Sequence, residues 1–179
     1  MQYVMNVNAY GPWRVTKAFA PLLIAEKGRV VTIGSISGIL SSATLGVYSM
    51  SKHAVEAFTD SLAEQMAPLG VSVSVIEPGN YDSDIFKTAI VRAGGNPKDG
   101  DRSQYKPPDD VAAAVSQALF EPTPKRRYMT VGNPREGEIT IRKAIDELVQ
   151  LNEGHPYTYD RAALIAMIDA ALEKARPRP

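Results

Sequence analysis

The spacing of hydrophobic positions predicts a chain in which helices alternate with short strands. In the first part of the sequence, apolar residues recur every three or four positions, which is typical of an amphipathic helix. These positions are Tyr3, Val4, Val7, Tyr10, Val15, Phe19, Leu22 and Leu23. The pair Gly11-Pro12 falls inside this pattern, so we expect it to bend the helix or to let another backbone approach.

Short runs rich in β-branched residues predict the strands. The first, Arg29–Ile33, has the length and apolar character of a buried parallel strand and leads into the Gly/Ser-rich stretch 34–38. The second covers residues 71–76 and runs into Pro78-Gly79, and the third covers residues 127–132. Strands separated by helical segments indicate an α/β fold with a parallel sheet.

The remaining helices are predicted from apolar stripes and end signals. A helix over 48–69 should end at Pro68-Leu69-Gly70, and Pro107 and Pro108 with a capping aspartate should open another. The expected buried side of this second helix is formed by Val111, Val115, Ala118, Leu119 and Phe120. Between them, residues 80–107 are expected to form a long irregular loop, in which Asp82 and Asp84 indicate either a helix N-terminus or added negative charge. Two amphipathic helices are predicted at 138–151 and 159–175.

Composition narrows the class of protein. The 179 residues suit one domain, and the 20 basic residues balance the 20 acidic ones, so neither nucleic acid nor an anionic membrane is an expected partner. There is no cysteine for a disulfide or a thiolate metal site, and His53 and His155 have no ligand-spaced companions. We therefore expect no metal and a cytoplasmic location.

Tyr48 and Lys52 carry the strongest chemical signal. They stand four residues apart at the front of a helical segment, so the phenol and the ammonium can share one face. An ammonium about 4 Å from the phenol, at an effective dielectric of ~20, favours the phenolate by up to about 4 kcal/mol. That pairing predicts a phenol pKa lowered toward ~7, where a general acid/base works best. Ser35, where the first strand meets its loop, can hydrogen-bond the same substrate oxygen.

With these motifs the sequence resembles the short-chain dehydrogenase/reductase family. Ser35 stands at the end of a Gly-Arg-Val-Val-x-Ile strand, thirteen residues before the Tyr48-x-x-x-Lys52 motif. The family's Asn-x-x-Gly fits Asn8 to Gly11, and its Pro-Gly motif fits Pro78-Gly79, with Ser83 at the place of the family's threonine. The resemblance covers residues 1–132 and implies the C-terminal part of a doubly wound, Rossmann-type sheet. Residues 133–179 would then be a helical extension packed on the same domain.

The resemblance implies an oxidoreductase that uses NAD or NADP to interconvert an alcohol and a ketone or aldehyde. Tyr48 would exchange the proton, Lys52 would lower its pKa and hold the nicotinamide ribose, and Ser35 would polarise the carbonyl. Asn8 would position its helix and a proton-relay water. Cofactor contacts are implied for Tyr48, Lys52, Pro78, Gly79, Asn80 and Ser83. Helix 48–69 would be the contact of a possible homo-oligomer.

Two alternatives to an oxidoreductase stay open. The chain could be a non-catalytic half-domain that binds another subunit, or a lyase or epimerase of the wider family. No strand with a glycine-rich turn precedes Gly28, so we expect a fragment of a longer parent that binds nicotinamide dinucleotides weakly on its own. We also expect the open edge of strand Arg29–Ile33 and the uncovered faces of the first helix to favour association.

Overall fold

A computed structural model describes residues 1–175 of the chain. The chain divides into two compact units, Met1–Thr140 and a second that begins at Ile141, and each is described by itself. Among the described residues, no helix combines the length and apolar character that crossing a membrane requires.

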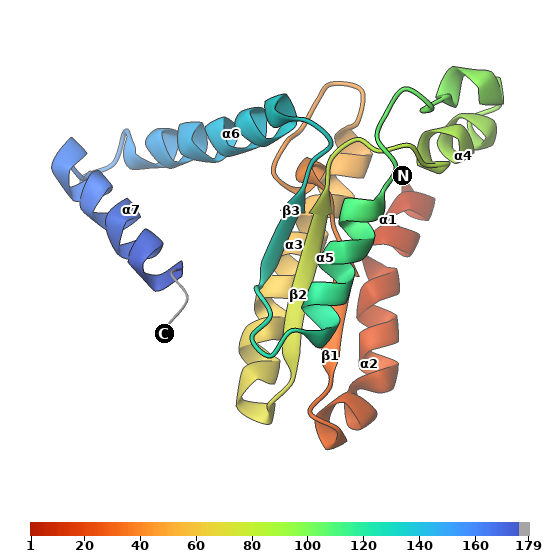
Figure 1. The fold of residues 1–179 in the computed structure, drawn as a ribbon. Coiled ribbons are helices and arrows are strands. Elements are labelled where there is room, and N and C mark those ends of the chain that lie inside the picture. Colours follow the sequence, from red (N-terminus) through yellow and green to blue (C-terminus); the bar gives the residue numbers. More distant parts are fainter. Residues whose placement is uncertain (176–179) are drawn as a thin grey trace. The chain divides into compact units, whose positions relative to one another are not determined.

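The first unit is built on a parallel sheet of three strands (Figure 1). The strands are β1 (Arg29–Ile33), β2 (Ser72–Pro78) and β3 (Arg127–Thr130), in the order β1-β2-β3. Arg29 pairs with Ser72 and Ile33 with Ile76, so β1 and β2 run in register along the whole of β1. The predicted α/β class with a parallel sheet is confirmed.

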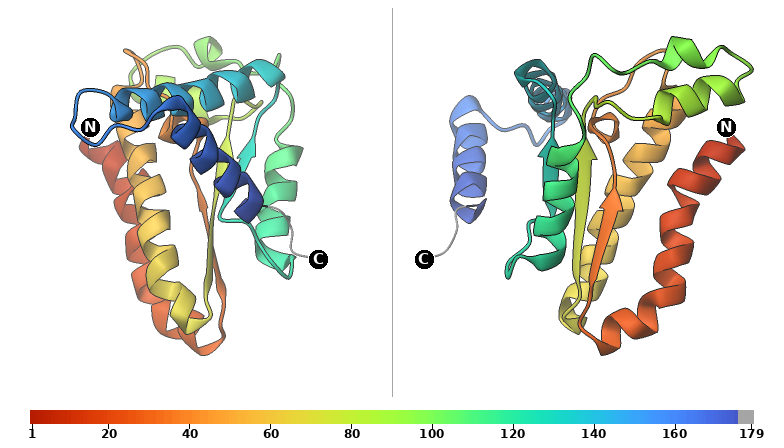
Figure 2. Two further views of the ribbon diagram at one scale, coloured as in Figure 1. Left: turned by 90° about the vertical axis from the view of Figure 1, so that its left-hand side faces the viewer. Right: turned by 45° about the vertical axis from the view of Figure 1, so that its right-hand side comes forward.

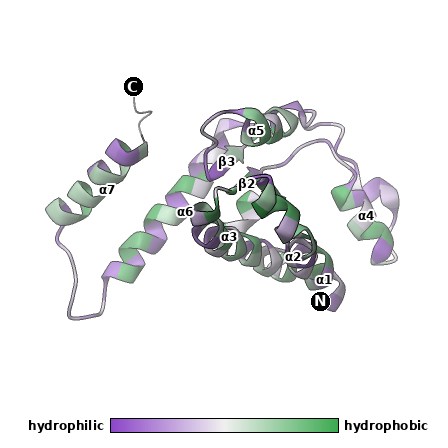
Figure 3. Ribbon diagram, turned by 90° about the horizontal axis from the view of Figure 1, so that it is seen from below, coloured by the Kyte–Doolittle hydropathy of each residue, from purple (hydrophilic) through white to green (hydrophobic). Residues whose placement is uncertain are grey.

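Helices cover both faces of this sheet. Helices α2 (Tyr10–Ala25) and α3 (Gly46–Met66) lie on one side, and α5 (Asp109–Phe120) lies on the other, as the view from below shows (Figure 3). Each face has its own hydrophobic cluster. On the α3 side it contains Leu62, Ala63, Met66, Val71 and Val73. On the α5 side it contains Ile76, Ala114, Ala118 and Tyr128. The central strand β2 is therefore buried on both faces, and the polar residues Ser74 and Glu77 are buried with its valines and isoleucine.

The edge strand β1 departs from its prediction. It forms where expected, but only Thr32 is buried. The three residues before it are half-buried, and Ile33 is 49% exposed. The apolar run was interpreted as a fully buried strand, whereas among the described residues only β2 pairs with it. Strand identity is a local property, but burial depends on what packs against both faces and the edge.

The first helical region contains two helices rather than one bent helix. Helix α1 (Gln2–Asn8) ends at Ala9 and α2 begins at Tyr10, so the break precedes the predicted Gly11-Pro12 (Figure 2). Pro12 thus lies in the first turn of α2, where the backbone N–H groups have no partner within the helix and a proline costs nothing. Pro21, in contrast, lies within α2.

Helix α3 ends close to the predicted signals. Its α-helical part stops at Met66, a turn of 3₁₀-helix covers Ala67–Leu69, and Gly70 follows with φ 78°. This left-handed conformation is the one that glycine adopts without strain at a helix end. The return to Val71 and β2 is consequently short.

The segment between β2 and α5 is more ordered than predicted. Instead of an irregular loop it contains α4 (Ile85–Arg92) and a short 3₁₀-helix at Pro97–Gly100. Asp84 is the residue before α4, which agrees with its interpretation as a helix N-terminus. The glycines and prolines of this segment obscured a helix of two turns.

Helix α5 differs from its prediction at both ends. Pro108, not an aspartate, occupies the N-cap, and Asp109 and Asp110 lie in the first turn, where their charges still favour the helix dipole. Phe120 was expected in the core but is 77% exposed at the last helical position. Ala118 is buried as predicted, and Ala114, which was not predicted, is buried beside it; both small residues allow α5 to lie close to β2.

The C-terminal helices are α6 (Pro134–Asn152), whose first turns belong to the first unit, and α7 (Arg161–Ala175). Helix α6 begins four residues before the predicted start. Within the second unit, the Asn152 side chain exchanges two hydrogen bonds of 2.9 Å with the backbone of Tyr159, which fixes the connection between the helices. That residues 133–179 pack on the preceding domain stays a prediction.

Candidate active site

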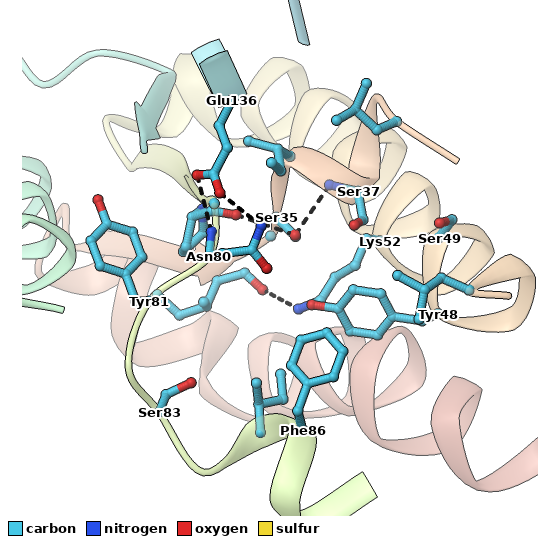
Figure 4. Close-up of a pocket in the computed structure, with 18 of the residues that line it drawn as sticks. Ser35, Ser37, Tyr48, Ser49, Lys52, Asn80, Tyr81, Ser83, Phe86 and Glu136 are labelled. Carbon is cyan, nitrogen blue, oxygen red and sulfur yellow. Dashed lines mark hydrogen bonds between the residues drawn. The ribbon is translucent and has the colours of Figure 1, made fainter. Parts of the chain in front are cut away.

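Side chains of the predicted motifs meet at the edge of the sheet where the parallel strands end. Ser35 follows β1, Pro78 ends β2, and the first turns of α3 and α6 lie beside them (Figure 4). A cavity of about 600 Å³ opens there. Its polar lining includes Ser35, Ser37, Tyr48, Ser49, Lys52, Asn80, Ser83, Arg102 and Glu136. Open α/β sheets bind ligands at this edge.

Ser35 is fixed by two hydrogen bonds. Its hydroxyl donates to the carbonyl oxygen of Pro78 at 3.3 Å and accepts from the backbone N–H of Ser37 at 3.1 Å. The side chain is buried, and it caps the short 3₁₀-helix Ile36–Gly38. The serine oxygen therefore has a fixed place between the ends of β1 and β2.

Tyr48 and Lys52 project from the first two turns of α3 into the same cavity, as their spacing predicts. The Lys52 amine lies 5.6 Å from the centre of the Tyr48 ring and donates a 2.8 Å hydrogen bond to the carbonyl oxygen of Ile33. Lys52 is buried, with 8% of its surface exposed. The ammonium is thus held by strand β1, at the side of the phenol.

The predicted lowering of the Tyr48 pKa is wrong for this chain. Burial raises the pKa of the phenol above its ordinary value of 10.0, and hydrogen bonding with Ser35 offsets only part of that rise. Burial also lowers the pKa of Lys52 from 10.5 to about 8, against the opposing charge of Glu56. The simple charge argument omitted the cost of desolvating both groups, which disfavours the phenolate and the ammonium alike. At neutral pH the phenol is consequently protonated.

Glu136 closes another wall of the cavity. Its carboxylate accepts hydrogen bonds from the side-chain amide of Asn80 at 2.8 Å and from the backbone N–H of Asn80 at 3.2 Å. Gly79 passes so close that a Cβ at this position would collide with Glu136 Oε2. A larger residue after Pro78 would force the Glu136 carboxylate to move, and this buried carboxylate holds the turn after β2 through Asn80.

The predicted cofactor contacts differ in what they still offer to a ligand. Pro78, Gly79, Asn80 and Ser83 all border the cavity. The N–H of Gly79 is bonded to the Thr130 carbonyl at 2.7 Å, and the N–H of Asn80 is bonded to Glu136. Ser83 is exposed at the rim (Figure 4). Their role toward a nicotinamide stays a prediction.

Asn8 does not line the cavity. Its side-chain amide donates a 3.1 Å hydrogen bond to the hydroxyl of Ser51, which in turn donates a 2.7 Å bond to the carbonyl oxygen of Tyr48. Asn8 therefore connects α1 to the turn of α3 that carries the tyrosine. This contact agrees with a positioning role, whereas the predicted relay of protons is not tested.

Sequence reasoning missed Glu136 and Arg102. A signal for Glu136 was available, because Asn133-Pro134-Arg135-Glu136 has the residue types of a helix start, and the Asn133 side chain does accept a bond from the Glu136 N–H at 3.1 Å. Tyr81 and Phe86, from the same segment as Arg102, also line the cavity. Nothing local distinguished Arg102 from a surface arginine.

Comparisons with known proteins agree with this geometry. Residues 1–92 match the family described as short chain dehydrogenase. The mitochondrial D-beta-hydroxybutyrate dehydrogenase of Bos taurus is 51% identical over 78 residues, which are 44% of this chain and 23% of that protein. The matched segment is therefore less than a quarter of that relative's length.

Solved structures show the same fold. The structure of a putative short-chain dehydrogenase from Novosphingobium aromaticivorans has a TM-score of 0.61 at 22% identity, and it covers 98% of this chain and 59% of that one. A short chain dehydrogenase from Burkholderia cenocepacia, solved in complex with NADP, has a TM-score of 0.58 at 22% identity. The latter match covers 82% of this chain and 55% of that one.

Proposed function

The chain belongs to the short-chain dehydrogenase family, and we propose that it carries the proton-transfer site of an oxidoreductase that interconverts an alcohol and a ketone or aldehyde with NAD or NADP. The observation that supports this most is the meeting of Tyr48, Lys52 and Ser35 in one cavity at the carboxyl edge of the sheet. A cytoplasmic location is part of the same proposal.

Tyr48 is the proton donor in the direction of carbonyl reduction. Its raised pKa keeps the phenol protonated at neutral pH, so the proton is available when negative charge develops on the substrate oxygen. In the reverse direction the phenolate takes the proton of the alcohol.

Lys52 stabilises the phenolate that forms after proton donation. The amine lies 5.6 Å from the centre of the Tyr48 ring, so a positive charge on it favours the phenolate, against the burial that raises the phenol pKa. Its hydrogen bond to Ile33 holds it in place, and with a pKa of about 8 it is mostly charged at neutral pH. The Ser35 hydroxyl, held by Ser37, would hydrogen-bond the substrate oxygen beside the phenol.

The residues present fit the nicotinamide end of the cofactor. The Ser83 hydroxyl and the turn at Pro78 and Gly79 border the cavity that contains Tyr48, and Lys52 offers an ammonium toward a ribose. The nicotinamide, when bound, supplies or accepts the hydride. These four residues would hold it, while proton transfer remains with the side chains of this chain.

Replacing Tyr48 by phenylalanine tests the proposal. Turnover is followed by the absorbance of reduced nicotinamide, in the 179-residue chain and in the longest natural reading frame that contains it. We expect kcat to fall at least ~100-fold while cofactor affinity stays unchanged, because only the transferable proton is removed. Tyr157→Phe, at a tyrosine that is 79% exposed, is the matched control. Unchanged turnover in Tyr48→Phe would sink the assignment.

A further inference from the structure

Arg102 lines the same cavity as Ser35 and Tyr48, although it comes from the segment between α4 and α5. Its guanidinium lies 3.6 Å from the centre of the Phe86 ring and 4.6 Å from the centre of the Tyr105 ring. Contact with two aromatic rings fixes the plane of the guanidinium and removes much of its freedom. The arginine is therefore held in one orientation before any ligand arrives.

One hydrogen bond also orients this guanidinium. Arg102 Nη1 donates to the side-chain oxygen of Asn80 at 2.8 Å, and the amide nitrogen of Asn80 is bonded to Glu136. Arg102 thus ends a chain of three polar side chains that follows the cavity wall. Its direct partner is a neutral amide, and Glu136, the acidic member of the chain, already receives both of its bonds from Asn80.

The charge of Arg102 has no direct counter-ion in the part of the chain that the structure describes. Arg102 takes part in none of the ion pairs found among those residues. The neighbouring Asp101 is turned to the backbone N–H of Ser103, at 2.9 Å. A guanidinium has five N–H donors, so most of its hydrogen-bonding capacity remains for a ligand.

A preoriented, half-buried guanidinium at the wall of a largely apolar cavity suits one ligand group above others. Its planar fork matches a carboxylate with two parallel hydrogen bonds, which a neutral carbonyl or hydroxyl cannot provide. We propose that the substrate is a hydroxy acid or oxo acid whose carboxylate binds Arg102 while its reacting oxygen lies at Tyr48. This inference rests on the proposed function for the role of Tyr48, but the carboxylate site stands on Arg102 alone.

The remaining lining agrees with an apolar carbon chain between the two polar ends. The apolar residues Leu40, Leu45, Ile85, Val111 and Ile139 border the cavity. A substrate that is polar at both ends and apolar between them leaves no buried polar group unpaired in such a site. Lys52, the other cation of the lining, donates to the Ile33 carbonyl and lies beside the tyrosine, so the two ends of the site are chemically distinct.

Binding of levulinate, a stable oxo acid, to the 179-residue chain tests the carboxylate site without any turnover. We expect Arg102→Gln to weaken levulinate binding by at least ~10-fold, as the loss of charge-assisted hydrogen bonds predicts, and to leave methyl levulinate binding unchanged. Arg102→Lys keeps the positive charge but loses the paired N–H donors of the guanidinium. Its affinity for levulinate should therefore lie between those of the wild type and Arg102→Gln. Lys98→Gln removes one positive charge from the same segment at an exposed site and should change nothing. Equal levulinate affinity in wild type and Arg102→Gln, or no binding by the wild type, overturns the proposal.

Two further measurements separate this inference from its premise and from the cofactor. Tyr48→Phe should still prefer levulinate over methyl levulinate by the same factor as the wild type, so failure of the proposed chemistry leaves the carboxylate result intact. Reduced cofactor is titrated into wild type and Arg102→Gln, each in the longest natural reading frame that contains the chain, and we expect the same affinity for both. A loss of cofactor affinity as large as the loss for levulinate would show that the guanidinium serves a cofactor phosphate, and it would overturn the substrate assignment.

Discussion

The side-chain amine of Lys52 donates a 2.8 Å hydrogen bond to the carbonyl oxygen of Ile33, the last residue of β1. This bond joins the start of α3 to the end of a strand that lies 19 residues earlier in the chain. It places a buried amine beside the phenol of Tyr48, and the acceptor of its hydrogen bond is a backbone carbonyl of β1 rather than a carboxylate.

Lys52→Met should remove a pH dependence of stability. The Lys52 pKa is about 8 in the folded chain against 10.5 ordinarily, so the folded state loses this proton first as pH rises. The free energy of unfolding of the wild type should therefore increase between pH 8 and 10, by up to ~3 kcal/mol. Urea denaturation at pH 7 and pH 10 measures this, and the variant should lack the increase while losing turnover. An equal increase in both proteins would contradict the cause assigned to the shift.

Glu77→Gln should remove a pH dependence of stability that has the opposite sign and lies at lower pH. Burial first, and then the neighbouring charge and hydrogen bond of Glu56, raise the Glu77 pKa from 4.5 to about 8. The folded state keeps the Glu77 proton to higher pH than the unfolded chain does. The stability contributed by the protonated carboxyl is therefore complete below pH 4.5 and is lost as pH rises through 8. Thermal melts at pH 5 and pH 8 should show the wild type losing ~1–3 kcal/mol over this interval, and Glu77→Gln losing clearly less.

The exposed ion pair of Glu64 provides the control for that experiment. Glu64 contacts Arg126 at 2.9 Å with 75% of its side chain exposed. Glu64→Gln should keep the wild-type slope between pH 5 and pH 8. If Glu64→Gln flattened the curve as much as Glu77→Gln, general surface charge rather than the buried carboxylate would be responsible.

The buried hydroxyls of Thr32 and Thr59 should behave as a coupled pair. They are 2.9 Å apart between β1 and α3, and Thr59 is fully buried. Thr59→Val should cost ~1–3 kcal/mol because it takes a partner from the buried Thr32 hydroxyl. In a double-mutant cycle by denaturant unfolding, the double valine variant should cost less than the two single changes together. Strict additivity would argue against the pair, and Thr88→Val at an exposed position is the control.

Gly79→Ala should disturb the wall of the cavity through Glu136. The added methyl group meets Glu136 Oε2, so the change should cost ~1–3 kcal/mol in stability. Adding Glu136→Ala removes the collision, and the combined variant should be more stable than additivity predicts. Gly46→Ala, where a Cβ has open space, should be neutral or slightly stabilising. Equal effects at Gly46 and Gly79 would exclude the close approach as the reason for the second glycine.

Some elements were predictable because their signals are local. The β-branched run defines β1 to the residue, and Gly70 ends the turn after α3 in the left-handed conformation that its type allows. The spacing of Tyr48 and Lys52 brings both side chains into one cavity. Helix α4 was missed because its eight residues lie among turn-forming residues, and a short helix is stabilised mainly by its tertiary contacts.

The sequence by itself determined the parallel α/β class, the bounds of β1 and the residue types of the proton-transfer site, since these depend on periodicity and on neighbours within a turn. Only the tertiary structure decided that Glu136 reaches Asn80 across 56 positions and that Arg102 reaches it across 22. It also decided the sense of the Tyr48 pKa shift. Burial and contacts between distant segments are set by how the whole chain packs, and desolvation in that packing outweighs the charge that local spacing suggested.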